Sequence, residues 1–469
     1  MLLVFAFVGC DLIDGTSVQN PDLTLDEAIG QPNSAESWVA GLERRTSMFY
    51  GGFQVSHFTV AAELATDNYE NKATFFNQNV DAGVYRHIDP DFDDAQFNLH
   101  RLREQAIFGI ETVIPENDPD AAGTALEAEM YFFKGWSHLI AGETFVALPE
   151  EPDGAAVSPE THYNRAIEAF EEANSISANV SYDMALARTY YAMGNKSQAV
   201  QYAQDVLAAD PEFLRGAEFD GVNGPINAIQ LAVYERQSFN DLQPLPRLDF
   251  LDPKYGDLPG TQQSPIIMQS AEEAHLILAE AAHSDGDIGA FQGHLHDLLA
   301  LIDERPVDDF DETEEGRQGT AGDIVRPDTS AFVVRADANS PFIDGLVLYR
   351  TAATTVPRVS GTSVTEAQID ALTAADVDAL ELYFLMRQEV MFGEARRMFD
   401  IGIRWPVSET EELNNPNITP SDIQAFIPAY VPEPYRQMNA FDMDRENFEV
   451  TIAVNMNRVL AEQKGNRFD

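Results

Sequence analysis

Two stretches of the chain share one arrangement of small and apolar residues, and this repeat limits the fold more than any other feature. Residues 180–211 and 272–302 each have an apolar stripe at helical spacing, then a glycine, then a second stripe. Gly194 and Gly286 stand where a first helix ends, and Pro211 ends the second helix of the earlier stretch. The stripe positions are Leu186, Ala187, Tyr190 and Ala199 in the first stretch and Leu278, Ala279 and Ala282 in the second.

The spacing of both stretches is typical of tetratricopeptide repeats, in which helix pairs stack into a superhelix with a concave binding face. Residues 163–173 have the pattern of the second helix of a preceding pair. Helical periodicity also predicts long helices over residues 25–49 and 125–148, the second of them stopped by Pro149. We therefore predict a mostly α protein with a tetratricopeptide-like helical layer, an α-superhelix, whose helix pairs lie around residues 125–302.

Long segments without this periodicity interrupt the helical pattern. Residues 219–265 and 305–357 are rich in Pro, Gly and Asp, and we expect irregular insertions there, packed over the helical layer, with a short strand at 345–350. Residues 67–94, rich in Asn, Asp and aromatics, have the composition of a loop. Insertions of this length on a rigid scaffold are where ligand contacts concentrate.

The chain is strongly acidic, and this excludes one class of partner. Asp and Glu number 78 against 29 Lys and Arg, for a formal net charge of −49 over 469 residues. Such a surface repels phosphate backbones, so we expect no nucleic-acid partner. A solvated acidic surface with Arg favoured over Lys fits a halophilic source, where salt screens the self-repulsion.

The sequence contains no recognised catalytic signature. Gly-x-Ser-x-Gly, the phosphate-binding loop and His-Glu-x-x-His are all absent from it. Glycosidases use a pair of carboxylates, but such pairs occur throughout a chain this acidic, so their presence does not indicate a glycosidase. We predict that the protein is not an enzyme and needs no cofactor.

Two groups of residues have some features of metal ligands. The aspartates of residues 89–93 imitate the start of a calcium loop, but Asp94 replaces the glycine that such a loop needs and His100 replaces its bidentate glutamate. His294 and His296 are two residues apart on a predicted helix, so their side chains point to different faces. We therefore predict no metal site.

The stretch 380–405 predicts a helix with charged residues on its apolar side. The apolar stripe consists of Leu380, Phe384, Met391 and Met398. Arg387 and Glu394 fall on the same stripe. Asp400 lies three or four residues from three arginines, Arg396, Arg397 and Arg404. Because an unpaired buried charge is costly, we expect structural ion pairs that lock this helix at the seam between the helical layer and the insertions, and not a ligand-binding arginine cluster.

Cys10, the one cysteine of the chain, closes an apolar run and is followed by a polar segment. This is the cleavage and lipidation pattern of a bacterial lipoprotein, in which the thiol carries the lipid anchor. We expect residues 1–10 to be a signal region and residues 11–469 a single domain. Because the run is short and lacks a positive n-region, we expect the translation start to lie upstream. A buried, unmodified thiol is the alternative.

Motifs along the whole chain are similar to those of one bacterial family. The matching stretches are residues 127–149, 180–211, 270–281 and 380–405, the last with Arg387-Gln-Glu389, Phe392-Gly-Glu394 and Arg397-Met-Phe-Asp400. They resemble, in this order, the early helix, the tetratricopeptide core, the Leu-x-x-Ala-Glu-Ala helix and the charged helix of the SusD/RagB family. Cys10 matches the family's lipidated cysteine. The chain departs from the family at its end, where it continues to Asp469 without the usual Asn-Pro-Gly-aromatic ending.

The resemblance implies a binding protein on the outer surface of the outer membrane, held there by a lipid (palmitate) anchor on Cys10. Members of this family capture oligomeric nutrients, commonly glycans, and deliver them to a TonB-dependent outer-membrane transporter. The expected partners are therefore an oligosaccharide or other oligomeric nutrient, the transporter and, through the lipid, the membrane. The best local candidates for ligand binding are amides and aromatics of one loop, namely Asn68, Tyr69, Asn71, Phe75 and Phe76.

Other functions stay open on the sequence alone. A tetratricopeptide-type scaffold would bind a protein partner through its concave face, with no small ligand. A surface glycoside hydrolase would need a pair of carboxylates beside its substrate. For the candidate loop, the alternative is that Phe75 and Phe76 are core residues.

Overall fold

The computed structural model describes residues 33–52, 58–71, 77–235, 242–256, 263–311, 326–327, 329–349, 353–433 and 438–469. Cys10, Phe75 and Phe76 lie outside these ranges, so what we expect of them stays a prediction. Among the described helices, none combines the length and the apolar character needed to cross a membrane.

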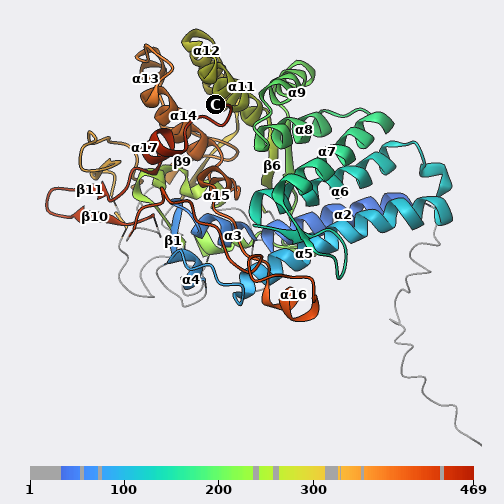
Figure 1. Cartoon of the computed structure of the whole chain (residues 1–469). Helices are drawn as coiled ribbons and strands as arrows, with labels where there is room; N and C mark the ends of the chain where they lie inside the picture. The colour runs from blue at the N-terminus through green and yellow to red at the C-terminus, as the bar shows by residue number, and fades with distance from the viewer. Residues whose placement is uncertain are drawn as a thin grey trace, which may run out of the picture.

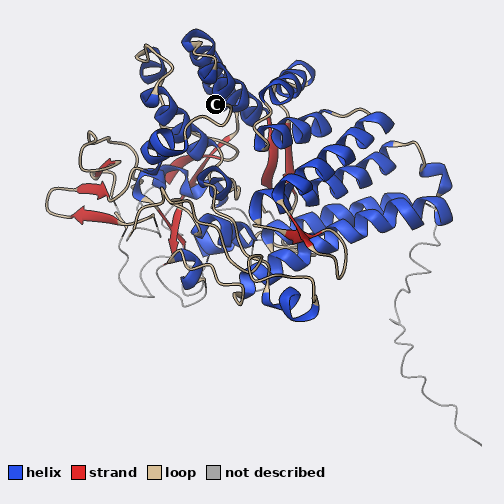
Figure 2. Cartoon of the chain, in the orientation of Figure 1, coloured by secondary structure: helices blue, strands red, loops and turns tan. Residues whose placement is uncertain are grey.

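Helices dominate the described chain, and the strands are short (Figure 2). The helices are α2 (Ser34–Gly51), α3 (Phe58–Leu64), α4 (Gln78–Asp81), α5 (Pro90–Phe108), α6 (Ala125–Thr144), α7 (Pro159–Ile176), α8 (Val180–Ala192), α9 (Lys196–Ala209), α10 (Ala228–Gln230), α11 (Ala271–Ser284), α12 (Ile288–Glu304), α13 (Glu366–Asp370), α14 (Val377–Val390), α15 (Arg397–Ile401), α16 (Glu409–Asn414) and α17 (Met456–Val459). The 3-10 and π-helical turns are η1 (Gly109–Asn117), η2 (Pro119–Ala121), η3 (Leu231–Glu235), η4 (Pro246–Tyr255) and η6 (Leu460–Lys464). The strands are β1 (Tyr69–Asn71), β2 (Leu148–Pro149), β3 (Ala156–Val157), β4 (Leu214–Ala217), β5 (Leu242–Pro244), β6 (Ile266–Ser270), β7 (Val307–Asp311), β8 (Val333–Arg335), β9 (Ala353–Pro357), β10 (Phe441–Asp444) and β11 (Glu449–Ile452).

Side-chain caps explain where the long helices begin. The Thr124 side chain accepts a hydrogen bond from the backbone at the start of α6, and Ser158 and Ser270 do the same for α7 and α11. These oxygens satisfy N–H groups that have no acceptor within the helix. The capped helices therefore start at positions that the sequence specifies locally.

The helical layer consists of successive helix pairs, α6 with α7, α8 with α9 and α11 with α12, which lie side by side in Figure 1. Gly194 and Gly286, with φ of +69° and +71°, make the turns inside the second and third pairs. The predicted mostly α fold with a tetratricopeptide-like layer is confirmed. Helix α6 ends at Thr144, earlier than expected, because the chain enters strand β2 at Leu148.

The insertions are only partly irregular. The first contains η4 and β5, which pairs with β1, and the second contains β7 and β9, which pair with each other. The prediction of a strand at 345–350 is wrong, because the described part of that stretch contains no β-strand. The strands of this region are β8, which precedes the stretch, and β9, which follows it. The loop expected over residues 67–94 is also wrong in part, because it includes β1, α4 and the start of α5.

The stretch 380–405 forms two helices and not one. Helix α14 ends at Val390 and α15 begins at Arg397. Between them Gly393 and Ala395 adopt φ of +77° and +60°, which a continuing helix cannot contain. The Tyr255 hydroxyl donates a 2.9 Å hydrogen bond to Gly393 O, so contact with the first insertion fixes the break.

The charged residues of this stretch lie in buried ion pairs with partners that are mostly distant in sequence. Arg387 Nε is 2.8 Å from Asp400 Oδ1, and Arg397 Nε is 2.7 Å from Asp67 Oδ1. Glu394 accepts from Lys254 Nζ at 2.6 Å. The local arginine partners expected for Asp400 are therefore wrong, because the break after α14 turns Asp400 back toward Arg387. The pairs join the helical seam to the loop at Asp67 and to η4.

The end of the chain packs on the helical layer. Asn466 Nδ2 donates to Glu280 O at 2.7 Å, and Arg467 N donates to the Glu280 carboxylate at the same distance. The ring of Phe468 lies edge-on to that of Tyr191, at 5.7 Å between centroids. The C-terminal extension therefore connects α8 and α11.

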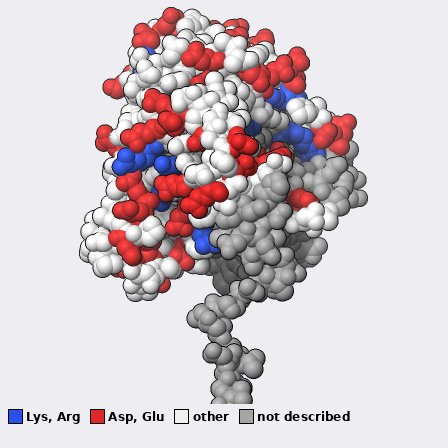
Figure 3. All heavy atoms as spheres, turned by 90° about the vertical axis from the view of Figure 1, so that its right-hand side faces the viewer, with Lys and Arg blue, Asp and Glu red and all other residues white. Residues whose placement is uncertain are grey.

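The face of the molecule seen in Figure 3 is acidic, because carboxylates outnumber basic side chains among its described residues.

Candidate functional site

The three described residues of the predicted ligand loop lie in the protein interior. Asn68 is fully buried, donating to Glu63 at 2.7 Å and accepting from Gln388 at 2.9 Å. Tyr69 is also fully buried and stacks on Phe392 at 4.8 Å between ring centroids. Asn71 is 7% exposed. These side chains hold the fold together in this structure and do not offer a surface to a ligand.

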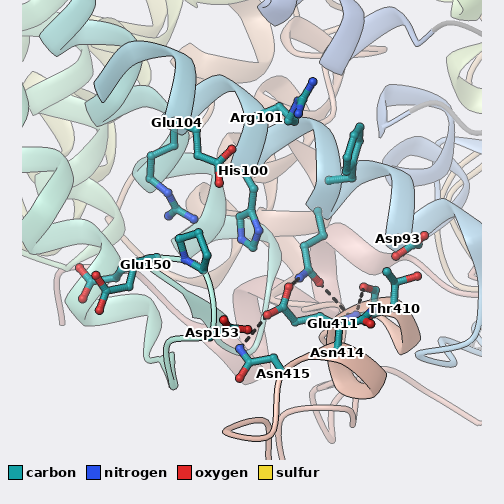
Figure 4. Close-up of a pocket in the computed structure, with 16 residues that line it drawn as sticks. Asp93, His100, Arg101, Glu104, Glu150, Asp153, Thr410, Glu411, Asn414 and Asn415 are labelled. Atoms are coloured by element: carbon teal, nitrogen blue, oxygen red, sulfur yellow. Dashed lines mark hydrogen bonds between the residues drawn. The ribbon is translucent and has the colours of Figure 1, made fainter. Parts of the chain in front are cut away.

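A hollow of about 330 Å³ lies elsewhere, where three segments distant in sequence meet (Figure 4). One wall is α5, the second is the loop of residues 150–153 after β2, and the third is α16 with the residues that flank it. This volume lies at the lower end of the range for small-molecule sites. Its lining combines carboxylates, amides, arginines and one exposed aromatic ring.

Helix α5 supplies the longest wall because one of its faces carries the lining residues. The lining positions are Asp93, Gln96, Phe97, His100, Arg101, Arg103 and Glu104, most of them at helical spacing. The Asp89 side chain caps the helix by accepting from Asp91 N at 3.2 Å. The aspartates of residues 89–93 therefore serve as a cap and an acidic first turn, which the helix dipole favours.

Hydrogen bonds across the hollow hold α16 against α5. Gln96 donates to Glu411 Oε2 at 3.1 Å and accepts from Ser408 N at 2.9 Å. Asn415 donates to Glu411 Oε1 and to Gly154 O, both at 2.7 Å. Because the network ties α5, α16 and the loop near residue 154 together, the walls are preorganised for a ligand.

An exposed aromatic ring stands at the hollow beside a cation. Phe97 is 55% exposed, and the Arg101 guanidinium lies 5.4 Å from its ring centroid. A single exposed apolar side chain is common on a protein surface, but this ring borders a polar cavity. The ring offers a flat apolar face and Arg101 offers fixed donors, a combination that suits a ligand with both apolar faces and hydroxyl groups.

His100 points into the hollow in Figure 4 and has an unused polar atom. Its Nε2 is buried and has no hydrogen-bond partner among the described residues. Burial, with a further contribution from Arg103, lowers the pKa of His100 to about 3. The imidazole is therefore neutral at physiological pH and adds no charge to the hollow.

A second hollow, of about 740 Å³, adjoins the first, since Glu150 and Glu151 line both. It is formed mainly by α6 and α7, and it repeats the combination of an aromatic ring and a cation, because Lys134 Nζ lies 6.0 Å from the ring centroid of Tyr131. The two hollows therefore lie next to each other.

Comparison with solved structures identifies the fold. A SusD-like carbohydrate binding protein from Bacteroides vulgatus ATCC 8482 matches with a TM-score of 0.55 at 12% identity, over 84% of this chain and 98% of that chain. A SusD superfamily protein from Bacteroides thetaiotaomicron VPI-5482 matches with a TM-score of 0.55 at 13% identity, over 82% and 98%. A laminarin binding SusD-like protein matches with a TM-score of 0.50 at 12% identity, again over 82% and 98%.

The chain has the SusD fold. At these identities the likeness is one of fold alone, and the sequence itself matches no protein-family model and no curated protein. The SusD likeness covers nearly the whole length of those chains. The predicted resemblance to the SusD/RagB family is thereby confirmed at the level of fold.

Sequence reasoning missed the hollow at α5. Two of its walls, α5 and α16, are more than 300 residues apart in sequence, as the separation of 315 between Gln96 and Glu411 shows, so no local pattern joins them. One signal was present in the sequence, namely polar residues and Phe97 recurring along one face of an amphipathic helix.

Proposed function

We propose that this SusD-fold protein binds a neutral oligosaccharide at the hollow between α5, the loop of residues 150–153 and α16. The observation that carries the proposal is the fold, which is shared over 82–84% of the chain with SusD-like proteins described as binding carbohydrate and laminarin. The hollow adds the required chemistry, with an exposed ring at Phe97 and carboxylates and amides that match sugar hydroxyls.

The charges of the hollow favour a neutral glycan over an acidic one. Its carboxylates are Asp93, Glu104, Glu150, Glu151, Asp153 and Glu411, against the arginines Arg101 and Arg103. With a net charge of −49 on the whole chain, this environment repels uronic acids and sulfated sugars. Neutral sugars avoid this repulsion and pack their apolar faces on aromatic rings.

A binding role without turnover is part of the same proposal. We infer that the carboxylates orient hydroxyl groups and do not cleave the glycan, in line with the description of the SusD-like relatives as binding proteins. Incubation of the protein with the bound oligosaccharide should leave the chain length of the sugar unchanged. Release of shorter products that ceases on replacement of one lining carboxylate would contradict this.

We further propose that the protein is lipid-anchored at Cys10 on the outer face of the outer membrane and passes its ligand to a TonB-dependent transporter. The support is the sequence pattern at Cys10 and the SusD-type fold. Mass spectrometry of the membrane-extracted protein should find an acylated Cys10 as its first residue. A free thiol preceded by an intact Met1 would refute the anchor, and purification of the tagged protein without any transporter would refute the partnership.

The binding site is tested by isothermal titration calorimetry with neutral laminari-, malto- and xylo-oligosaccharides. Replacement of Phe97 by Ala should weaken binding about tenfold or more, because a stacked ring and its burial contribute about 1–3 kcal/mol. Phe426→Ala is the matched control, since Phe426 is 52% exposed and lies outside the hollow. Equal affinity in the Phe97 and Phe426 variants would contradict the proposed site.

A further inference from the structure

Two histidines and an aspartate from neighbouring helices meet at one point on the last helix pair. His275 lies on α11, and His294 and Asp297 lie on α12, which packs beside it (Figure 1). One nitrogen of each histidine and one carboxylate oxygen lie within 4.8 Å of one another. Asp297 follows His294 by three residues, so the two side chains share a face of α12. The ring centroids of the histidines are 6.4 Å apart.

Both histidines have a buried nitrogen with nothing to bind. The Nδ1 atoms of His275 and His294 have no hydrogen-bond partner among the described residues. Buried polar atoms are almost always partnered, so an unpartnered nitrogen on each histidine of this cluster calls for an explanation. An imidazole nitrogen without a proton is the form that binds a metal ion.

We propose that His275, His294 and Asp297 form a binding site for a divalent transition-metal ion such as Zn²⁺. Two imidazole nitrogens and a carboxylate oxygen are donors that zinc and its neighbours accept, whereas Ca²⁺ and Mg²⁺ prefer oxygen alone. Metal–donor distances of about 2.0–2.2 Å place tetrahedral donors about 3.4 Å apart. Small side-chain rotations reach this from the present spacing, because Asp297 is exposed and the histidines are only half-buried.

The neighbouring histidine, His296, does not belong to this cluster, as expected from its position two residues after His294. His296 points away from this cluster and pairs with Asp370, with Nε2 to Oδ1 at 3.0 Å. The second ligand of His294 is therefore not the histidine two residues later but His275, nineteen positions earlier on the facing helix. A metal ion here would connect α11 to α12 and leave a fourth coordination position open to water.

The proposed metal site is independent of the proposed glycan site. Helices α11 and α12 stand at the top of Figure 1, whereas α16 lies at the bottom. Metal binding and oligosaccharide binding can therefore be measured separately in the same full-length protein, and failure of either proposal leaves the other unaffected.

The test titrates metal-free protein with ZnCl₂ by calorimetry and with Co²⁺ by visible absorption, in high salt with excess CaCl₂ to fill nonspecific carboxylate sites. We expect one Zn²⁺ per chain and a Co²⁺ spectrum of a four-coordinate site with nitrogen ligands. His275→Ala and His294→Ala should each weaken Zn²⁺ binding about tenfold or more. His296→Ala, the matched control on the same helix, should bind like the wild type.

Thermal unfolding of each variant without metal verifies that it folds. Added Zn²⁺ should raise the melting temperature of the wild type and of His296→Ala, because the ion binds only the folded helix pair tightly. It should not raise that of His294→Ala. Unchanged Zn²⁺ affinity in His275→Ala and His294→Ala, an equal loss in His296→Ala, or no Zn²⁺ binding by the wild type would each overturn the proposal.

Discussion

Replacement of Asp400 by Asn should strongly destabilise the fold. The side chains of Arg387 and Asp400 are 0% and 2% exposed, and their one hydrogen bond joins Nε to Oδ1 at 2.8 Å. The Nη1 and Nη2 atoms of Arg387 have no hydrogen-bond partner among the described residues. The Asp400 carboxylate is therefore the main partner that compensates the buried charge of the Arg387 guanidinium. Removing one partner of a buried ion pair costs about 3–5 kcal/mol, because the other charge stays buried and unpaired.

This loss can be expressed as a melting temperature. A chain of 469 residues has an unfolding entropy of about 1 kcal/mol/K, so the melting temperature should fall by about 3–5 °C. Scanning calorimetry measures it directly. Asp378→Asn is the control, since Asp378 pairs with Arg458 at the surface, with side chains 74% and 36% exposed. An exposed pair is worth about 0–1 kcal/mol.

The pH dependence gives a second check on the same variant. Despite burial, Arg387 holds the pKa of Asp400 below its ordinary value. A lowered folded-state pKa contributes stability that is present above the unfolded pKa and lost as pH falls through the folded one. The difference in melting temperature between the wild type and Asp400→Asn should therefore be largest at neutral pH and should decrease in strong acid. A loss no larger than that of Asp378→Asn, or a difference that does not change in acid, would refute the reasoning.

Two further substitutions probe the interior and the hollow. Burial raises the pKa of Glu63 to about 7, and such a group stabilises the fold below its unfolded pKa and loses this contribution as pH rises through the folded one. As pH rises from about 5 to about 8, the melting temperature of Glu63→Gln should therefore rise relative to that of the wild type. A difference in melting temperature that stays constant over this range would contradict this. His100→Leu should not lower the melting temperature, because the buried Nε2 has no protein partner to lose. Thermal unfolding measures this, and a clear fall in the melting temperature would contradict it.

Local chemistry explains which parts of the fold the sequence could predict. The helix pairs were predictable because Gly194 and Gly286 mark their turns and side chains such as Ser270 cap their starts. The break after α14 was not, because Gly393 and Ala395 take their conformations in contact with other parts of the chain, Tyr255 and Glu63 among them. A stripe at helical spacing cannot report a contact that forms only in the folded state.

The same reasoning applies to the candidate sites. The loop of Asn68 and Tyr69 has the composition of a sugar-binding surface, yet burial and not composition decides what a side chain can contact. The hollow at α5 and the cluster of His275 with His294 each depend on segments brought together by tertiary packing. Tertiary contacts of this kind have no signature in a single sequence.

A crystal structure of the protein with a bound neutral oligosaccharide tests the central claim most directly. We predict electron density for the sugar between α5 and α16, with one ring packed on Phe97. Sugar bound at another surface, with this hollow empty and Phe97 free, would contradict the account.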